Sequence, residues 1–344
     1  MRRNFIISDG WNMKPGEDVT GKMVTALKRL GFERVFDLDL GADFTIMEEA
    51  TEFINRVKSG GVLPLFSSCS PGWVKFVETF FPQNIPNLST CKSPQQMLGA
   101  VIKTYYAEKK NLDPRNIYSV SVMPCTAKKF EASRPELGRN GYQDVDAVLT
   151  TRELAQMIRR FNLDLSLQPE AADSPFGIRS SAGKIFGVTG GVMEAAIRSA
   201  YHFLTGNELG DLKVEAVRGL AGIKEAHINI AGKEIGVAVV NGLGNARRLL
   251  NQINAGTRKN IHFVEVMTCP GGCVGGGGQP YGTDIGKIKR RSYELYHIDD
   301  METLRVSHAN PEIVQIYNEF LGEPNSHKAH ELLHTHYHQR VALT

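Results

Sequence analysis

Three apolar stretches of this 344-residue chain each run directly into a loop that contains cysteine, and this repeated arrangement constrains the fold more than any other feature of the sequence. The stretches are residues 61–66, 117–122 and 261–266, and the cysteines that follow them are Cys69, Cys125, Cys269 and Cys273. Short apolar runs bounded by glycine and proline are typical of buried strands. In open α/β sheets, ligands bind beyond the carboxyl ends of the strands. The sequence therefore predicts an α/β fold in which separate strands bring cysteines to one site.

The third loop combines its two cysteines with glycine. Positions 275–278, just after Cys273, are all glycine, and glycine lets a backbone approach a ligand closely because it has no side chain. A C-x3-C pair alone is weak evidence of a metal site. Thiolates that converge from three loops are stronger evidence, because soft sulfur ligands select iron–sulfur clusters and a few other metals. We therefore expect an iron–sulfur cluster or another thiolate-bound metal here.

Between the expected strands, apolar residues recur with helical spacing. The spacing predicts helices over residues 18–32, 41–57, 73–81, 97–109, 151–161, 192–204 and, in the tail, 310–340. Thr20 and Thr151 are expected as N-caps, and Pro71 in a first helical turn. Residues 163–184 are rich in Pro, Asp, Ser and Gly, which is typical of a loop. We expect an N-terminal lobe over residues 1–162, a C-terminal lobe over 163–305 and a helical tail over 306–344.

Two polar patterns on these helices have alternative interpretations. Glu49, Glu52 and Arg56 are spaced i, i+3 and i+7, so they share one helix face, and such a row is ordinarily a surface ion-pair stripe. In the tail, His327, His330 and His334 are spaced for a metal site or for a structural helix rich in histidine. A glycine loop at residues 186–191 precedes an expected helix, but it lacks the Lys-Ser/Thr of a phosphate-binding P-loop.

Composition excludes several classes of protein. An odd number of cysteines, five, does not suggest a disulfide framework and fits a reducing compartment. The chain has no 18-residue apolar run, and its first residues lack the apolar segment of a signal peptide, so we expect a cytoplasmic protein that does not enter the membrane. A net charge of +3 does not indicate nucleic-acid binding. One basic run is either a solvated face or a docking patch for an acidic electron-transfer partner: Lys287, Lys289, Arg290 and Arg291.

Three segments resemble the signature motifs of [FeFe]-hydrogenases. They read Ser-Cys-Ser-Pro-Gly-Trp at 68–73, Met-Pro-Cys-Thr-Ala-Lys-Lys-Phe-Glu at 123–131, and Glu-Val-Met-Thr-Cys-Pro-Gly-Gly-Cys-Val-Gly-Gly-Gly-Gly-Gln-Pro at 265–280. The resemblance implies a two-lobed α/β domain, each lobe a mostly parallel sheet flanked by helices. It also implies interconversion of protons and electrons with H2 at an H-cluster, in which a [4Fe-4S] cubane is joined to a two-iron subsite that carries CO, cyanide and an azadithiolate bridge.

The resemblance implies roles for individual residues. The cubane ligands are Cys125, Cys269 and Cys273, of which Cys273 bridges to the two-iron subsite. Lys128 is expected to hydrogen-bond a cyanide ligand. The other residues expected around the two-iron subsite are Gln95, Met123, Pro124 and Met267. The residues expected on the proton path are Cys69, Glu49, Ser89 and Glu52, with Arg56 near the outer end.

The sequence departs from the family pattern at Ser70, where the family usually has a cubane cysteine. Cys69 aligns with the proton-transfer cysteine, and a serine oxygen is a poor substitute for a thiolate. Two arrangements are open: Cys69 becomes the metal ligand and Ser70 takes over proton transfer, or the cubane is labile. The segment before Lys14 is also unlike the family.

The expected partners follow from what the sequence lacks. No C-x2-C-x2-C run that would hold accessory clusters precedes the domain, so electrons are expected from ferredoxin or a similar small carrier. Dedicated maturation proteins are expected to supply the two-iron subsite, in the cytoplasm or in the lumen of an anaerobic organelle. The alternative function is a non-turnover iron–sulfur binding or sensory protein, which Ser70 favours.

Overall fold

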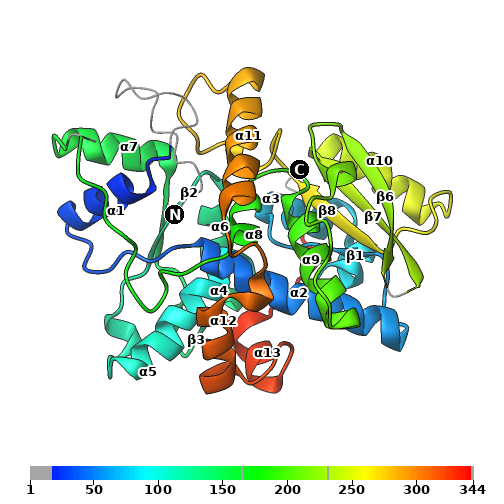
Figure 1. The fold of residues 1–344 in the computed structure, drawn as a ribbon, viewed down its shortest axis with the longest axis horizontal. Helices are drawn as coiled ribbons and strands as arrows, with labels where there is room; N and C mark the ends of the chain where they lie inside the picture. Colours follow the sequence, from blue (N-terminus) through cyan, green and yellow to red (C-terminus); the bar gives the residue numbers. More distant parts are fainter. Residues whose placement is uncertain (1–17, 164–165, 231, 342–344) are drawn as a thin grey trace.

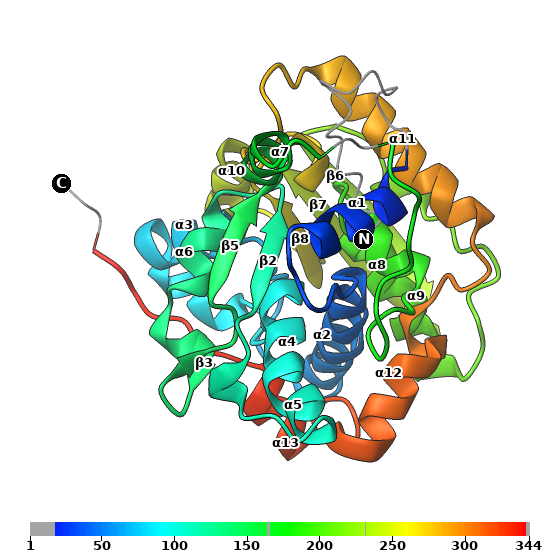
Figure 2. The ribbon, with the colours of Figure 1, turned by 90° about the vertical axis from the view of Figure 1, so that its left-hand side faces the viewer.

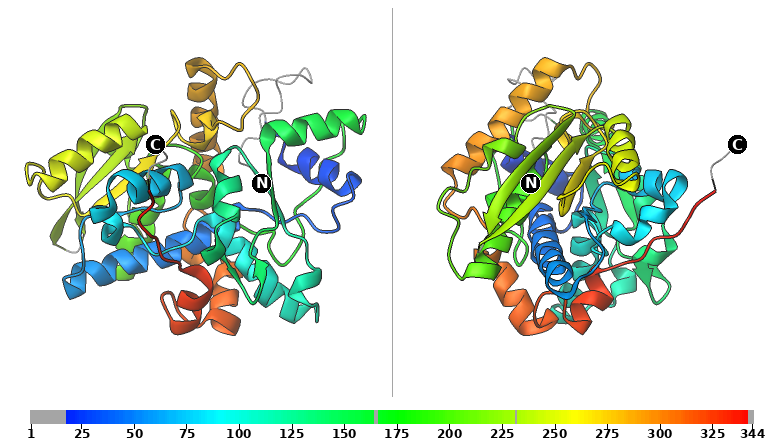
Figure 3. Two further views of the ribbon diagram at one scale, coloured as in Figure 1. Left: turned by 180° about the vertical axis from the view of Figure 1, so that it is seen from behind. Right: turned by 90° about the vertical axis from the view of Figure 1, so that its right-hand side faces the viewer.

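A computed structural model of the chain describes residues 18–163, 166–230 and 232–341. The segment before Lys14 lies outside the described residues. One sheet lies at one end of the molecule and a smaller strand pair at the other, and a long helix extends between them (Figure 1). The same division is visible from behind (Figure 3). This arrangement leaves the space between the two ends for the loops that follow the strands.

The larger sheet has four strands in the order β1-β8-β7-β6. Their bounds are Leu65–Phe66 for β1, Phe263–Met267 for β8, Lys233–Asn241 for β7 and Ile223–Ile230 for β6. The β1–β8 and β8–β7 pairs are parallel, and β7–β6 is antiparallel. The mostly parallel sheet that the sequence predicts is thus present. Its edge strand β1 comes from the first 162 residues and its neighbour β8 from the later part of the chain.

The second sheet is a parallel pair, β2 (Val120–Met123) and β5 (Ala147–Thr150). A small antiparallel pair joins β3 (Gly138–Arg139) to β4 (Tyr142–Gln143). Figure 2 shows the end of the molecule at which β2 and β5 lie, with α4 beside them. Of the parallel strands in the two sheets, β1, β2 and β8 lead into the loops that contain Cys69, Cys125 and Cys269.

The α-helices are α1 Thr20–Arg29, α2 Asp39–Ser59, α3 Pro71–Phe80, α4 Pro94–Val101, α5 Ala107–Lys109, α6 Ala127–Ala132, α7 Thr151–Arg160, α8 Ser181–Ile185, α9 Gly191–Thr205, α10 Leu243–Asn254, α11 Ile285–Met301, α12 Pro311–Ile316 and α13 His327–Leu333. The helices expected from the periodicity are present, and the structure adds α6, α8, α10 and α11, which the sequence analysis did not predict. A π-helical segment, Ile102–Tyr106, joins α4 to α5, and another, Tyr317–Leu321, follows α12. None of the helices within the described residues is long and apolar enough to cross a membrane.

Element ends differ from the sequence predictions for local reasons. The strand expected over residues 61–66 is reduced to two residues, because Pro64 has no N–H to donate to a ladder. The N-cap of α7 is Thr150 rather than Thr151, and it forms a capping box in which Glu153 accepts from the Thr150 N–H at 2.8 Å. Thr20 is the first residue of α1 rather than its cap. Pro71 begins α3, as predicted.

Helix α2 is the centre of the fold. Its first sixteen residues are almost all buried, because the helix packs against α4, α8 and α9. The backbones approach closely: a Cβ on Gly41 would lie 2.3 Å from the Pro94 carbonyl oxygen, and a Cβ on Gly183 would lie 2.4 Å from the Asp39 carbonyl oxygen. The carboxylates of α2 are therefore fixed in position by the core.

Candidate active site

The cysteine loops after β1, β2 and β8 meet at one cavity of about 150 Å³. Four cysteines line it: Cys69, Cys125, Cys269 and Cys273. Its other lining residues are Ser70, Pro71, Gly72, Pro94, Met123, Thr126, Ala127, Lys128, Phe186, Met267, Thr268, Gly272, Gly276 and Gly277. The fifth cysteine, Cys91, is buried elsewhere.

The glycine loop after Cys273 lies directly on the neighbouring cysteine loop. The Gly278 N–H donates to the Pro124 carbonyl oxygen at 2.9 Å, and a Cβ on Gly276 would lie 2.1 Å from that same oxygen. Around Gly277, by contrast, a Cβ would meet only the Thr126 hydroxyl at 3.5 Å. A side chain at Gly276 would separate the two loops, and one at Gly277 would occupy cavity space.

The donor set of the cavity fits a thiolate-bound cluster. Burial raises the pKa of Cys125 to about 11 and also raises the pKa values of Cys69 and Cys269, so these sulfurs are thiols unless a cation is bound. A coordinated metal reverses this effect, because it deprotonates its thiol ligands. Met123 and Met267 contribute apolar walls between the cysteines.

Ser70 lines the cavity beside the cysteines, and its hydroxyl does not cap α3. Its hydroxyl is 2.8 Å from the Thr268 hydroxyl, across the gap between the first and third cysteine loops. It is the N-cap residue of α3 by position, yet its side chain makes no capping hydrogen bond. The residue that replaces the usual cubane cysteine therefore connects the loops of the cavity through hydroxyl groups.

Lys128 provides a buried cation at the cavity wall. Its ammonium donates to the Cys69 carbonyl oxygen at 3.0 Å and to both Glu131 carboxylate oxygens at 2.9 and 3.0 Å. Gln95 donates to Glu131 at 3.2 Å and to the Lys128 carbonyl oxygen at 3.3 Å. Gln95 and Pro124 are not among the residues that line this cavity, and Gln95 lines a different one.

The carboxylate row on α2 is partly an ion pair, as its spacing suggests. Arg56 donates to Glu52 at 2.7 Å, and it also donates to the carbonyl oxygens of Val62, Pro86 and Leu88 at 2.9–3.1 Å. Glu49 and Glu52 are buried, so the row is not the exposed surface stripe that such spacing ordinarily indicates. Ser89 donates to the second Glu52 carboxylate oxygen at 2.7 Å, which continues the row inward.

Glu49 completes the row toward the cavity. Burial, with a further contribution from the charge of Glu52, raises its pKa to about 8, against the opposing effect of hydrogen bonds with Ser89 and the Ser68 backbone. One of its carboxylate oxygens has no hydrogen-bond partner. The Glu49 charge also raises the pKa of the Cys69 thiol. Glu52, Ser89 and Glu49 thus form a hydrogen-bonded series that begins at Arg56, and Glu49 influences Cys69 at the cavity through its charge.

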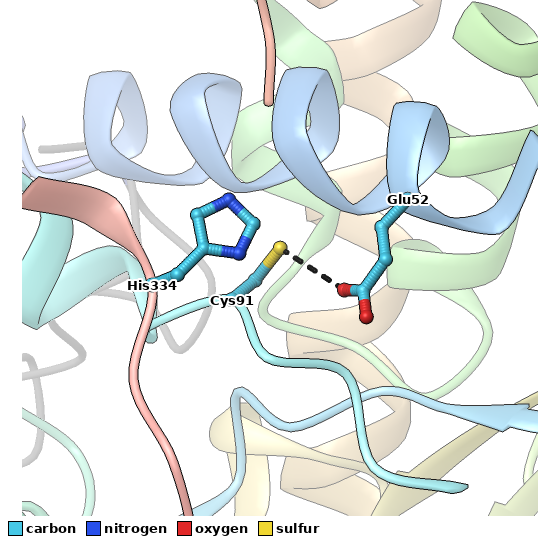
Figure 4. Close-up of side chains that lie close together, drawn as sticks. All are labelled: Glu52, Cys91 and His334. Atoms are coloured by element: carbon cyan, nitrogen blue, oxygen red, sulfur yellow. Dashed lines mark hydrogen bonds between the residues drawn. The ribbon is translucent and has the colours of Figure 1, made fainter. Parts of the chain in front are cut away.

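Cys91, for which no role was expected, lies in a buried cluster with Glu52 and His334. Figure 4 shows Cys91 between Glu52 and His334, and its thiol donates to a Glu52 carboxylate oxygen at 3.6 Å. Burial raises the Cys91 pKa well above its usual range. His334 is 2.9 Å from Glu48 and 2.8 Å from the Thr90 hydroxyl. Cys91 is two residues after Ser89, which the sequence analysis placed on the proton path, and this proximity is the only sequence signal for it.

Glu265 explains the glycine loop before α9. The Gly190 and Met193 N–H groups donate to its carboxylate at 2.6 and 2.7 Å, so an internal anion occupies the helix N-terminus where a phosphate could otherwise bind. Burial raises the Glu265 pKa to about 7 despite these hydrogen bonds. The sequence indicated the loop but not the strand residue that it binds.

One further sequence prediction is corrected, and the structure bears on the two alternatives for the tail histidines. Arg291 does not belong to an exposed basic run, because it is buried and donates to the Val274 carbonyl oxygen at 2.7 Å; Lys289 and Arg290 are exposed. In the tail, His327 and His330 are exposed and His334 is buried. Within the described residues, these three histidines do not form a metal-spaced group. His334 has the structural role instead.

Comparisons with known proteins decide the family. Residues 5–277 match "Iron only hydrogenase large subunit, C-terminal domain", and residues 285–340 match "Iron hydrogenase small subunit". The chain belongs to the iron-only hydrogenase family. Within this family it is 49% identical to "NADP-reducing hydrogenase subunit HndD" of Solidesulfovibrio fructosivorans over 98% of this chain and 59% of that protein. It is 48% identical to "Iron hydrogenase 1" of Clostridium pasteurianum over 96% of this chain and 58% of that protein. The chain thus spans less than two thirds of either relative.

A solved structure confirms the hydrogenase fold. The chain superposes on a variant of the [FeFe]-hydrogenase HydA1 from Chlamydomonas reinhardtii with a TM-score of 0.87 and 41% identity, over 99% of this chain and 93% of that one. The resemblance and the α/β fold class expected from the sequence are therefore both correct. Membership of an iron-only hydrogenase family also agrees with an iron–sulfur cofactor.

Proposed function

We propose that the chain catalyses the reversible reduction of protons to H2, in which two protons and two electrons combine to give one H2. The observation that carries this proposal is the buried series Glu52, Ser89, Glu49 and Cys69, which ends at a cavity with three further cysteines. A protein that only stores or senses an iron–sulfur cluster has no need of a titratable path into the cluster pocket. The non-turnover alternative leaves this series without a purpose.

The residues of the cavity suit an H-cluster. Cys125, Cys269 and Cys273 would hold the cubane, and Cys273 would bridge to the two-iron subsite. When bound, this group supplies the electrons and the open metal position for proton reduction. Lys128 is a charged donor for a cyanide ligand, and its charge is balanced by Glu131 at 2.9 Å. Met123 and Met267 exclude water from the pocket.

The carboxylate series would carry protons by steps between named atoms. A proton that reaches Glu52 beside Arg56 passes through the Ser89 hydroxyl, 2.7 Å away, to Glu49. Because its pKa is about 8, Glu49 holds a proton at neutral pH and can donate it inward to Cys69. Arg56 itself is permanently protonated, so it holds the Glu52 carboxylate in place rather than relaying protons.

With serine in place of cysteine at position 70, we assign Cys69 to the proton path. Cys69 lies within the electrostatic influence of Glu49, whereas the Ser70 hydroxyl is bonded to Thr268. We therefore favour Cys69 as the proton carrier, with three cysteines holding the cubane and Ser70 at its fourth corner. A hydroxyl at this corner makes the cubane more labile than four thiolates would.

Electrons would arrive from a ferredoxin-like carrier at α11. Lys289 and Arg290 are exposed on this helix. The same helix contacts the cysteine loop through Arg291, which binds the Val274 carbonyl oxygen, and through Ile288, which closely packs against Gly275. A carrier that docks on α11 would be close to the cubane ligands. Dedicated maturation proteins would supply the two-iron subsite, and a cytoplasmic location stays a prediction.

The test is H2 evolution by the anaerobically purified chain after reconstitution of its iron–sulfur cluster and addition of a synthetic two-iron complex. Evolution from a reduced mediator supports the proposal. Cys273→Ser should abolish it, whereas Ser133→Ala, an exposed change outside the cavity, should retain it. Equal activity in the two variants would contradict the assigned bridge, and an inactive wild type with a complete two-iron subsite would contradict the function.

A further inference from the structure

A second group of metal-ligating side chains lies outside the cysteine cavity, where α9 meets the start of the tail. His202 is on the last turn of α9, Glu208 is on the loop that follows, and His308 is on the short 3-10 helix Ser307–Ala309. One Glu208 carboxylate oxygen is 3.0 Å from His202 Nδ1 and 2.9 Å from His308 Nε2. Two imidazole nitrogens and one carboxylate oxygen therefore converge on a small volume.

Neighbouring side chains contact both imidazole rings. They stack with centroids 4.0 Å apart and an interplanar angle of 13°. Phe203 packs edge-on against both rings. The Ser199 hydroxyl is 3.0 Å from His308 Nδ1, on the opposite side of that ring from Glu208. A hydrogen bond to the distal nitrogen is the contact that fixes the ring orientation of metal-ligating histidines.

The charge of Glu208 also suits a cation between these groups. One ring nitrogen of each histidine faces the same Glu208 carboxylate oxygen, so a cation placed there would meet one negative charge and two ring nitrogens. A neutral imidazole carries its proton on either nitrogen, so each ring can present a lone pair on that side. His308 would then keep its proton on Nδ1, beside the Ser199 hydroxyl.

The site is accessible and has suitable spacing. The Glu208 side chain is 55% exposed and His202 is 34% exposed, whereas His308 is 5% exposed and forms the floor. Ligands about 2.0–2.1 Å from a tetrahedral zinc lie about 3.3 Å from one another. The contacts of 2.9 and 3.0 Å to Glu208 need a small expansion to reach that separation. The more exposed His202 ring must also turn out of its stack on His308, so that both nitrogens direct a lone pair at one cation.

We propose that His202, Glu208 and His308 bind one divalent transition-metal cation of the zinc class, with water at the remaining position. Nitrogen and oxygen donors of this kind suit Zn²⁺, Co²⁺ or Ni²⁺. The bound cation would join the end of α9 to the segment that leads into α12. That segment is already held by α2, because Ser307 and Asn310 donate to Asp43 at 2.7 and 2.8 Å. The metal would thus anchor the C-terminal tail, and the proposal does not depend on hydrogenase activity.

The experiment measures zinc binding to the full chain after the iron–sulfur cluster has been reconstituted, so that the cysteine cavity is occupied. Equilibrium dialysis against zinc chloride should give one more bound zinc per chain in the wild type than in Glu208→Gln or His202→Ala. A cation that binds only the folded state also raises the midpoint of thermal unfolding. We expect that increase in the wild type and its loss in both variants.

Two control variants separate this site from other histidines. His227→Ala removes a histidine that pairs with one glutamate, Glu234, at 3.0 Å and that, within the described part of the chain, belongs to no group of three possible metal ligands. His330→Ala removes an exposed histidine of the tail. Both controls should bind as much zinc as the wild type. The proposal is overturned if no zinc binds, or if Glu208→Gln and His202→Ala bind zinc with the affinity and stoichiometry of the wild type.

Discussion

At the scale of single residues, two glutamates on one face of α2 differ because their neighbours differ. Glu52 pairs with Arg56 at 2.7 Å, whereas Glu49, one turn earlier, is fully buried and one of its oxygens has no hydrogen-bond partner. The spacing of these residues predicted their shared face. It could not predict their burial, which depends on helices and loops that pack over them from elsewhere in the chain.

Glu52→Gln tests the proton path. The amide keeps the shape of the side chain but cannot carry a proton, so we expect H2 evolution to fall by about 10²-fold or more, the range of general acid–base contributions. The spectrum of the assembled cluster should not change. Glu108→Gln, an exposed change on α5, is the control and should evolve H2 at the wild-type rate. Wild-type rates in Glu52→Gln would show that protons take another route.

Glu49 should make stability depend on pH. Its pKa is about 8 in the folded chain against 4.5 ordinarily, so the folded state keeps this proton longer than the unfolded state does. The stabilisation is complete below pH 4.5 and is lost as pH rises to about 8, with a slope of at most about 1.4 kcal/mol per pH unit.

Denaturant unfolding of the cluster-free chain at pH 5 and pH 8 measures this effect. The decrease in the free energy of unfolding between the two pH values should be smaller in Glu49→Gln than in the wild type. It should not vanish, because Glu265, with a pKa of about 7, acts in the same direction. Glu331→Gln, an exposed change, should behave as the wild type. An equal decrease in Glu49→Gln would mean that Glu49 is ionised throughout.

Ser70→Cys should make the cubane more durable. A thiolate is a better iron ligand than a serine oxygen, so the reconstituted variant should lose iron to a chelator several-fold more slowly than the wild type. Ser133→Cys adds an exposed thiol away from the cavity and should not slow the loss. Equal loss from Ser70→Cys and the wild type would indicate that position 70 does not face the cluster.

At the scale of elements, the contact between α2 and α4 determines one wall of the cavity. Gly41 touches the Pro94 carbonyl oxygen, and Pro94 lines the cavity. Hydrophobic spacing predicted the positions and lengths of both helices. The need for glycine at their contact is not visible in the sequence, because it arises only when two backbones from different segments approach each other.

Gly41→Ala should disturb this wall. Its Cβ would lie 2.3 Å from backbone, so the helices must separate, at a cost of about 1–3 kcal/mol in the free energy of unfolding. Gly244→Ala in α10 is the matched control, since nothing lies within 4 Å of its Cβ and alanine favours a helix by up to about 1 kcal/mol. Denaturant unfolding compares the two. Equal stability of both variants would mean that α2 and α4 adjust freely.

At the scale of the whole molecule, the sites are assembled from segments far apart in sequence. β1 pairs with β8, Glu48 meets His334, and His202 meets His308. The sequence predicted that cysteine loops would converge, because each follows a strand and strand ends gather at one edge. No local pattern marked the histidine contacts or the burial of Arg291 under the cysteine loop, since each depends on the packing of remote elements.

The exposed cations on α11 should govern docking of the electron carrier. We expect Lys289→Glu with Arg290→Glu to lower kcat/KM for reduced ferredoxin by about tenfold at low ionic strength, because steering by charge acts on the encounter. The rate with a small neutral mediator should not change. Lys58→Glu with Arg160→Glu makes the same charge change on α2 and α7 and should have little effect. An unchanged ferredoxin rate in the α11 variant would place docking elsewhere.

The central claim is that an H-cluster assembles in the cysteine cavity despite Ser70. The most direct measurement is the infrared spectrum of the reconstituted chain after addition of the synthetic two-iron complex and removal of the excess by desalting. We expect sharp bands from iron-bound CO and cyanide that stay with the protein and are absent in Cys273→Ser. A wild-type chain that keeps its iron–sulfur cluster but shows no such bands after desalting would contradict the claim and leave an iron–sulfur protein without the two-iron subsite.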